Sequence, residues 1–128
     1  MGFGLDVCEL PHGVDEEDKR LFVGCRVPAR LVVLNTDSGQ VIAKLPIVGD
    51  TDDVFFDSTR QMIYAIGGEG FVDVFRLRDP DHIDKVTRVN SAPGARTGLF
   101  VPVFNRLYVA APHRGSQPAK VMVYEAPR

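Results

Sequence analysis

Short apolar runs of about five to eight residues alternate with turn sequences along the whole chain. No segment keeps the i, i+3, i+4 spacing of apolar residues that an amphipathic helix needs over several turns. The turn sequences are rich in Gly, Pro, Asp and Ser, as in TDSG, GGEG and APGA. The pattern predicts an all-β protein, with its clearest strands at residues 19–26, 30–36, 40–47, 52–57, 61–67, 71–77, 84–90, 95–102, 106–112 and 119–126.

Two strand motifs return three times along the chain. The first occurs as RLFV, MIYA and RLYV, and its leading apolar residues are 42 and 44 positions apart, at Leu21, Ile63 and Leu107. The second occurs as VVLNT, DVFRL and MVYEA, with matching residues at Leu34, Phe75 and Tyr124. A period of about 40 to 45 residues with four short strands is typical of a β-propeller blade. A β-sandwich is the alternative, but it would not require the same motifs to return.

Long strings in the sequence resemble a known family. GDTDD, GGEGFVDVF, APGART and PHRGSQ, with the stretches around them, are similar to the C-terminal part of bacterial YVTN-type β-propeller repeat proteins. The resemblance runs from about Glu9 to the end of the chain. It implies propeller blades, in a family whose members have enough repeats for a complete ring, and it implies little about biochemical function.

The strand count predicts three blades in one domain. Residues 1–9 form an extra leading strand, residues 10–48 the first blade, residues 49–91 the second, and residues 92–128 a third blade without its outermost strand. Closed propellers have about four to eight blades, so three blades cannot close. We expect the leading strand to complete the third blade of a neighbouring copy, giving an obligate homo-oligomer, most simply a homodimer with six blades. The alternative is a monomer trimmed from a longer propeller.

Composition narrows the class of partner and the location. Fifteen Lys and Arg against seventeen Asp and Glu give a net charge of −2, which leaves no basic surplus for nucleic acid. No apolar run is long enough to cross a membrane, and the N-terminus lacks the pattern of a signal peptide. We therefore expect a cytoplasmic protein with no membrane partner. Cys8 and Cys25 are expected to be small buried apolar residues, since two cysteines make neither a disulfide framework nor a zinc site.

Candidate ligand-binding residues gather on one predicted face. In a propeller, the linkers between blades and the loops between the second and third strands of each blade emerge on the same side. Turns such as DSTRQ and RDPDH fall on the other side and read as ordinary solvated turns. The candidate residues on the first side are His12, Asp50, Asp52, Asp53, Glu69, Arg96, Thr97, His113 and Arg114.

The three aspartates admit two interpretations. Their carboxylates could hold a hard cation such as calcium. Alternatively, one aspartate caps the turn and another, Asp53, pairs with Arg96 across the adjacent strand. His12 and His113 could meet across the joint between two copies, but a loop histidine is more often a hydrogen-bonding residue than a metal ligand. We assign no metal ligand and no cofactor, and we expect the Glu69 carboxylate to face solvent.

Two functions follow as hypotheses. The first is a non-enzymatic binding or scaffold module that takes a polar small molecule or a protein at the channel mouth. The alternative is a metal-dependent hydrolase or lactonase-like enzyme with a cation held by the channel carboxylates. The chain has no G-x-S-x-G, GxxxxGK or GxGxxG motif, so no sequence motif supports catalysis.

Overall fold

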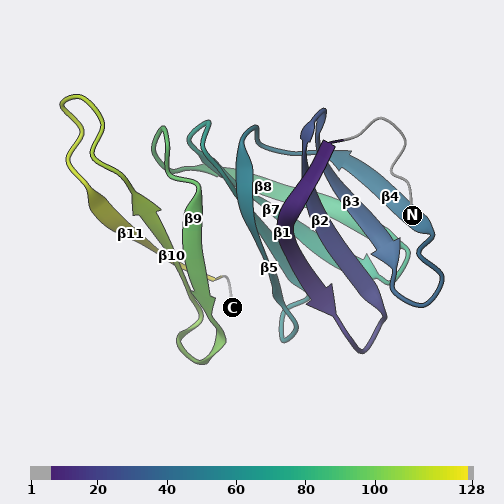
Figure 1. Ribbon diagram of the computed structural model, residues 1–128. Coiled ribbons are helices and arrows are strands. Elements are labelled where there is room, and N and C mark those ends of the chain that lie inside the picture. The colour runs from purple at the N-terminus through teal and green to yellow at the C-terminus, as the bar shows by residue number, and fades with distance from the viewer. Residues whose placement is uncertain (1–6, 127–128) are drawn as a thin grey trace.

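The computed structural model describes residues 7–126 and is all-β. Eleven strands form three antiparallel sheets (Figure 1). The first sheet contains β1 (Val7–Asp15), β2 (Arg20–Val27), β3 (Ala29–Asn35) and β4 (Val41–Pro46). The second contains β5 (Thr51–Asp57), β6 (Met62–Gly67), β7 (Phe71–Asp79) and β8 (His82–Asn90). The third contains β9 (Thr97–Val101), β10 (Arg106–Ala111) and β11 (Lys120–Glu125), with the short 3-10 helix η1 (Pro102–Phe104) after β9.

The two repeated motifs occupy the same place in each sheet. Leu21 lies opposite Leu34, Ile63 opposite Phe75, and Leu107 opposite Tyr124, always between the second and third strands. The positions that the two motifs match along the sequence are therefore equivalent in all three sheets. It follows that any residue of one sheet can be matched with its equivalents in the others by counting from these pairs.

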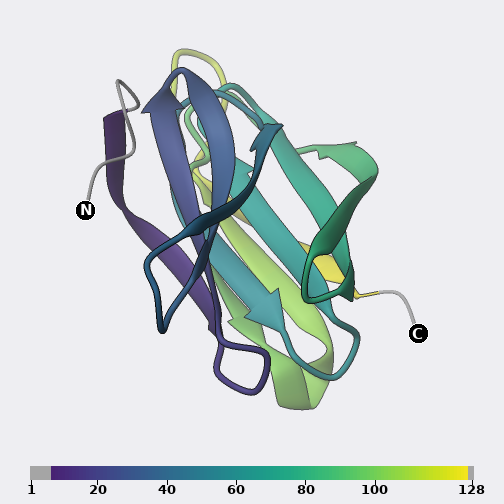
Figure 2. The same cartoon turned by 90° about the vertical axis from the view of Figure 1, so that its right-hand side faces the viewer.

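The three sheets are stacked in a row and bury apolar side chains between them. The third sheet lies at the left of Figure 1 and the first at the right, and the first sheet lies in front of the others in Figure 2. Phe22, Leu31 and Val33 of the first sheet pack against Ile63 and Phe75 of the second. On the other side of the second sheet, a separate core joins it to the third and includes Tyr64, Val72, Val74, Phe100, Leu107 and Val109.

Among residues 7–126, η1 is the only helix. Within residues 7–126, no helix is long and apolar enough to cross a membrane. The predicted blade boundaries at residues 48/49 and 91/92 lie in the two linkers between sheets, residues 47–50 and 91–96.

The predicted leading strand needs correction. Val7 and Cys8 belong to β1, where they pair with Val27 and Cys25 of β2, so residues 7–9 are part of the first sheet. The remainder of the predicted strand, residues 1–6, lies outside the described residues.

The cysteine prediction is also wrong. Cys25 is fully buried but disulfide-bonded, and Cys8 lies opposite it in the backbone register of β1 and β2. The spacing of two cysteines along the chain does not show that a strand pairing places them opposite each other. Disulfides persist mainly in oxidising compartments, so this bond does not favour the cytoplasmic location expected from the sequence.

Replacing Cys25 with serine should destabilise the oxidised protein by about 2–4 kcal/mol, because the disulfide restricts the unfolded chain. The free energy of unfolding, measured in urea with and without dithiothreitol, checks this. The difference between the wild type and Cys25→Ser should be larger without reductant than with it, where only the cost of a buried serine hydroxyl remains. Two titratable thiols in the denatured, unreduced wild type would contradict the disulfide.

Candidate functional site

Four charged side chains meet at one end of the first and second sheets, and we call them the charged rim: Arg26, Asp50, Asp52 and Arg96. The Arg26 Nη2 lies 3.3 Å from Asp52 Oδ1 and 3.6 Å from Asp50 Oδ1. The Arg96 Nη2 lies 2.8 Å from Asp50 Oδ2. Arg26 is the next-to-last residue of β2, Asp50 lies in the linker before β5, and Arg96 lies in the linker before β9. The charged rim therefore links the first sheet, the second sheet and the entrance to the third.

A buried aspartate holds the linker that carries Asp50. The Asp73 side chain is fully buried in β7, and its Oδ2 accepts the Val48 N–H at 2.8 Å. Arg88 of β8 donates to both Asp73 oxygens, with Nε at 2.6 Å and Nη2 at 2.9 Å. The Thr51 hydroxyl donates to the Val48 carbonyl at 2.7 Å. A buried carboxylate is costly unless it is paired and hydrogen-bonded, and here both conditions are met. The linker backbone is thereby fixed.

The charged rim is partly hydrated and balanced in charge. Its side chains are between 31% and 46% exposed, so each ion pair contributes at most about 1 kcal/mol to stability. Two guanidinium groups face two carboxylates, so the surface offers both hydrogen-bond donors and hydrogen-bond acceptors. Such a surface suits a polar partner better than an apolar one.

Asp53 does not pair with Arg96 as the sequence predicted. Its Oδ2 accepts the N–H of Gly98 on β9 at 2.9 Å, which ties the second sheet to the third. Arg96 pairs instead with Asp50, because Asp50 projects from the linker with a left-handed backbone, φ 58°. Burial raises the pKa of Asp53 above its usual value, with the Asp52 charge adding to the shift and the Gly98 hydrogen bond opposing it.

The other predicted residues lie in loops, at the start of a strand or, for His12, within β1. The Glu69 Oε1 accepts the Gly49 N–H at 2.9 Å, so this carboxylate also braces the linker and does not simply face solvent. Thr97 begins β9 and is exposed. His113 and Arg114 are exposed in the loop between β10 and β11. His12 pairs with Val23 through the backbone of β1, and its side chain lies outside the part of the chain that is described.

The structure brings together Asp50, Asp52 and Arg96 of the predicted residues, and it adds Arg26. Within the described ranges, no group of three or more His, Cys, Asp and Glu side chains is placed to hold a metal ion. The carboxylates of Asp50 and Asp52 face guanidinium groups, and Asp53 faces a backbone amide. Their arrangement binds the sheets to one another.

Sequence reasoning missed a second polar tie at the opposite end of the first two sheets. Arg20 is 7% exposed, and it donates from Nε to the Pro80 carbonyl at 2.6 Å and from Nη2 to Asp81 at 2.9 Å. The RDPDH turn is therefore a structural contact between two sheets. A signal was present in the sequence, because Arg20 immediately precedes the apolar run of β2 where the second repeat has Met62. Asp73 gave a similar signal as the polar residue inside FVDVF.

The third repeat differs from the first two at its outer face, which is the face of the third sheet that points away from the second sheet. Phe22 and its cross-strand neighbour Val33 are covered by the second sheet, and their equivalents Tyr64 and Val74 are covered by the third. The next equivalents are Tyr108 and Val123. Tyr108 is half-buried and Val123 is 53% exposed, and their neighbours Leu99 and Val121 are 58% and 64% exposed. We call these four residues the open face.

Asp50→Ala and Arg96→Ala should not be additive. We expect a coupling free energy of about 0.5–1 kcal/mol in a double-mutant cycle, because each variant removes the same exposed ion pair. Asp53→Ala combined with Arg96→Ala serves as the control and should be additive. Chemical denaturation of the single and double variants measures both. Coupling of Arg96→Ala with Asp53→Ala, and none with Asp50→Ala, would contradict the observed pairing.

Asp53→Asn should change how stability depends on pH. The pKa of Asp53 is raised in the folded state, so as pH rises through the usual value of 3.8 the unfolded chain loses its proton first. The wild type therefore loses stability until the pH passes the folded-state pKa, whereas asparagine, which can still accept the Gly98 N–H, does not titrate. The difference in unfolding free energy between variant and wild type, followed from acid to neutral pH, should shift in favour of the variant. A shift in favour of the wild type would refute the direction of the pKa change.

Comparison with known proteins supports the fold. No protein-family model and no curated protein sequence matches the chain. Among solved structures, it is similar to hydrazine synthase of Kuenenia stuttgartiensis, with a TM-score of 0.77 and 16% sequence identity. The similarity covers 90% of this chain and 33% of the hydrazine synthase chain, so this chain spans about a third of that length. At 16% sequence identity, this similarity shows a shared arrangement of strands and sheets.

Proposed function

We propose that the chain is a non-enzymatic binding and scaffold module, built from three β-propeller blades of the YVTN type. Each of the three sheets is one blade, and the charged rim is the surface offered to a polar small molecule or a protein. The open face is the surface through which the module assembles with a second copy of itself. Two copies joined head to tail would contain six blades, within the range of closed propellers.

The observation that carries this proposal is the register of the open face. Tyr108, Val121 and Val123 on the third sheet occupy positions whose equivalents are covered by the next sheet in both earlier repeats. Leu99, Tyr108, Val121 and Val123 lie on three adjacent strands, so they form one continuous patch. Contiguous apolar patches of this kind usually mark interaction sites.

Val123→Glu should weaken self-association by about tenfold or more, because it places a charge where an apolar side chain would be buried. Val103→Glu is the matched control, since Val103 is 81% exposed in η1 and lies off the open face. Size-exclusion chromatography with light scattering over a concentration series measures the mass of each variant. The wild type and Val103→Glu should form the same oligomer.

A wild type that stays monomeric at all concentrations would contradict assembly with a second copy. Equal association by Val123→Glu and the wild type would place the contact away from the open face.

A further inference from the structure

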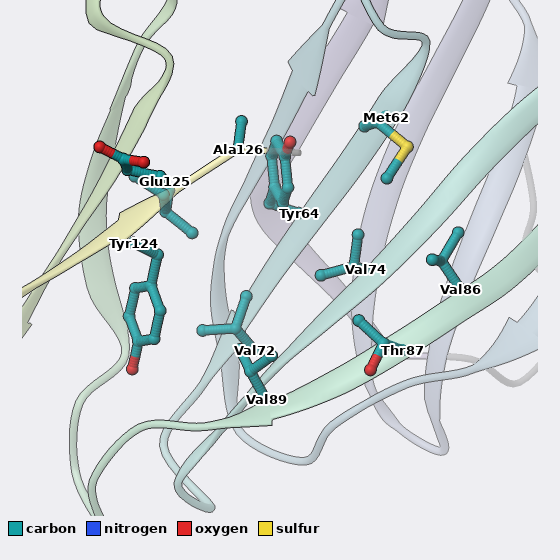
Figure 3. Close-up of a pocket in the computed structure, with 11 residues that line it drawn as sticks. Met62, Tyr64, Val72, Val74, Val86, Thr87, Val89, Tyr124, Glu125 and Ala126 are labelled. Carbon is teal, nitrogen blue, oxygen red and sulfur yellow. The ribbon is translucent and has the colours of Figure 1, made fainter. Parts of the chain in front are cut away.

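Apolar and charged groups occupy different parts of the boundary between the second and third sheets. A cavity of about 260 Å³ lies between the two sheets, and Glu125 is the one charged residue among the described residues that line it (Figure 3). The cavity therefore does not suit the polar ligand proposed for the charged rim. Positive charges lie instead at Arg96, in the linker before β9, and at Arg114, in the loop between β10 and β11.

Gly68 makes room for the ion pair of Asp50 and Arg96. It lies in the loop that joins β6 to β7, and it does not take the left-handed backbone conformation that favours glycine. A Cβ atom at this position would overlap the Asp50 carboxylate and would lie 3.2 Å from the Arg96 Nε. Glycine is therefore needed here for space, and the ion pair lies directly against the backbone of this loop.

Arg114 lies against a second glycine, which is a neighbour of the first. The Gly94 N–H donates to the Gly68 carbonyl at 2.8 Å. A Cβ atom at Gly94 would lie 2.9 Å from the Arg114 Nη1. The guanidinium groups of Arg96 and Arg114 therefore lie against two hydrogen-bonded segments of backbone.

The backbone that carries Arg114 is held by its own hydrogen bonds. The Arg114 and Gln117 N–H groups donate to each other's carbonyl oxygens at 2.9 Å and 2.8 Å. The Gln117 Nε2 donates to the Pro112 carbonyl at 3.0 Å. A ligand that binds Arg114 therefore does not have to order this part of the loop, which would weaken binding.

Both guanidinium groups have N–H donors left for a ligand. Asp50 Oδ2 faces the Arg96 Nη2 at 2.8 Å, and a guanidinium group has five N–H donors in all. The Arg114 side chain has no hydrogen bond or ion pair with another residue of the range 7–126. The Glu69 carboxylate, in the same loop as Gly68, accepts the Gly49 N–H and pairs with neither guanidinium group.

The charges at this place favour a ligand with one negative charge. The two arginines and two aspartates of the charged rim balance one another, so Arg114 adds an excess of one positive charge. A carboxylate matches this excess, and its two oxygens accept hydrogen bonds from guanidinium groups. A phosphate dianion would bring a second negative charge close to Asp50.

We propose that Arg96 and Arg114 bind the carboxylate group of the ligand, with Asp50 holding Arg96 in position. This inference rests on the proposed use of the charged rim as a binding surface, and it names the chemistry of the ligand. It is independent of self-association through the open face.

Titration with sodium acetate tests the proposal, with acetamide as the uncharged control. The full chain is labelled with nitrogen-15, and the Nε–H signals of its arginines are followed by NMR at constant ionic strength. We expect saturable shifts at Arg96 and Arg114 with acetate and none with acetamide. Acetyl-glycyl-glycine presents the same carboxylate on a peptide. Tighter binding than acetate assigns the ligand to the C-terminus of a polypeptide, and equal binding assigns it to a small organic acid.

Single variants separate this site from other arginines of the surface. Arg96→Gln and Arg114→Gln should each weaken acetate binding about threefold to fivefold, because each removes one exposed charged contact. Arg106→Gln is the matched control, since Arg106 is exposed at the opposite end of β10. Gly68→Ala should shift the Arg96 signal without acetate and weaken binding, because its Cβ displaces the Asp50 carboxylate.

Equal responses to acetate and acetamide, or unchanged affinity in both Arg96→Gln and Arg114→Gln, would overturn the proposal. Tighter binding of methyl phosphate than of acetate would overturn the choice of a carboxylate. Saturable shifts confined to Arg26 would keep the charged rim as a binding surface and would overturn only the place assigned to the carboxylate. No response of any charged-rim residue to acetate, acetyl-glycyl-glycine or methyl phosphate would count against the proposed function as well.

Discussion

Each sheet of this protein is apolar on both faces, so each face must be covered by something. In the first sheet, Phe22 and Val33 face the second sheet, while Val32 and Leu34 face the opposite way and are also buried. In the second sheet, Ile63 and Phe75 face one neighbour, while Tyr64 and Val74 face the other. Apolar side chains at successive positions of a central strand allow stacking on both sides. This constraint explains why the three sheets stack. It also explains the open face, because no further sheet among residues 7–126 covers the outer side of the third sheet.

Polar ties set how the stacked sheets are aligned. Asp73 holds the linker at one end of the first interface, and Arg20 holds the β7–β8 turn at the other end. Asp53 and the Gly98 N–H make a comparable tie between the second and third sheets. The apolar contacts supply most of the burial but little directional preference, whereas these hydrogen bonds have defined geometry. The charged rim is placed by the same ties, since Asp50 lies in the linker that Asp73 holds.

Much of the fold could be predicted from the sequence because it depends on local patterns. The strands follow from short apolar runs, and Leu21, Ile63 and Leu107, which the repeated motif matches in the sequence, occupy equivalent positions in the three sheets. The ion pairs of the charged rim were harder to predict. They depend on the directions in which side chains point, and the spacing of residues along the sequence does not give these directions. Arg96 reaches Asp50 and not Asp53 because the linker backbone turns through a left-handed residue at Asp50. The Cys25 disulfide similarly depends on strands that meet only in three dimensions.

The central claim is that the open face is an interface and that it is equivalent to the two covered faces. Solvent paramagnetic relaxation of methyl groups in concentrated protein tests this most directly, because it reports the solvent exposure of each methyl group. The account predicts that Val121, Val123 and Leu99 become as protected as Val33 and Val74 at high concentration and lose this protection on dilution. Full solvent exposure of Val121, Val123 and Leu99 at every concentration, with Val33 and Val74 protected throughout, would contradict it.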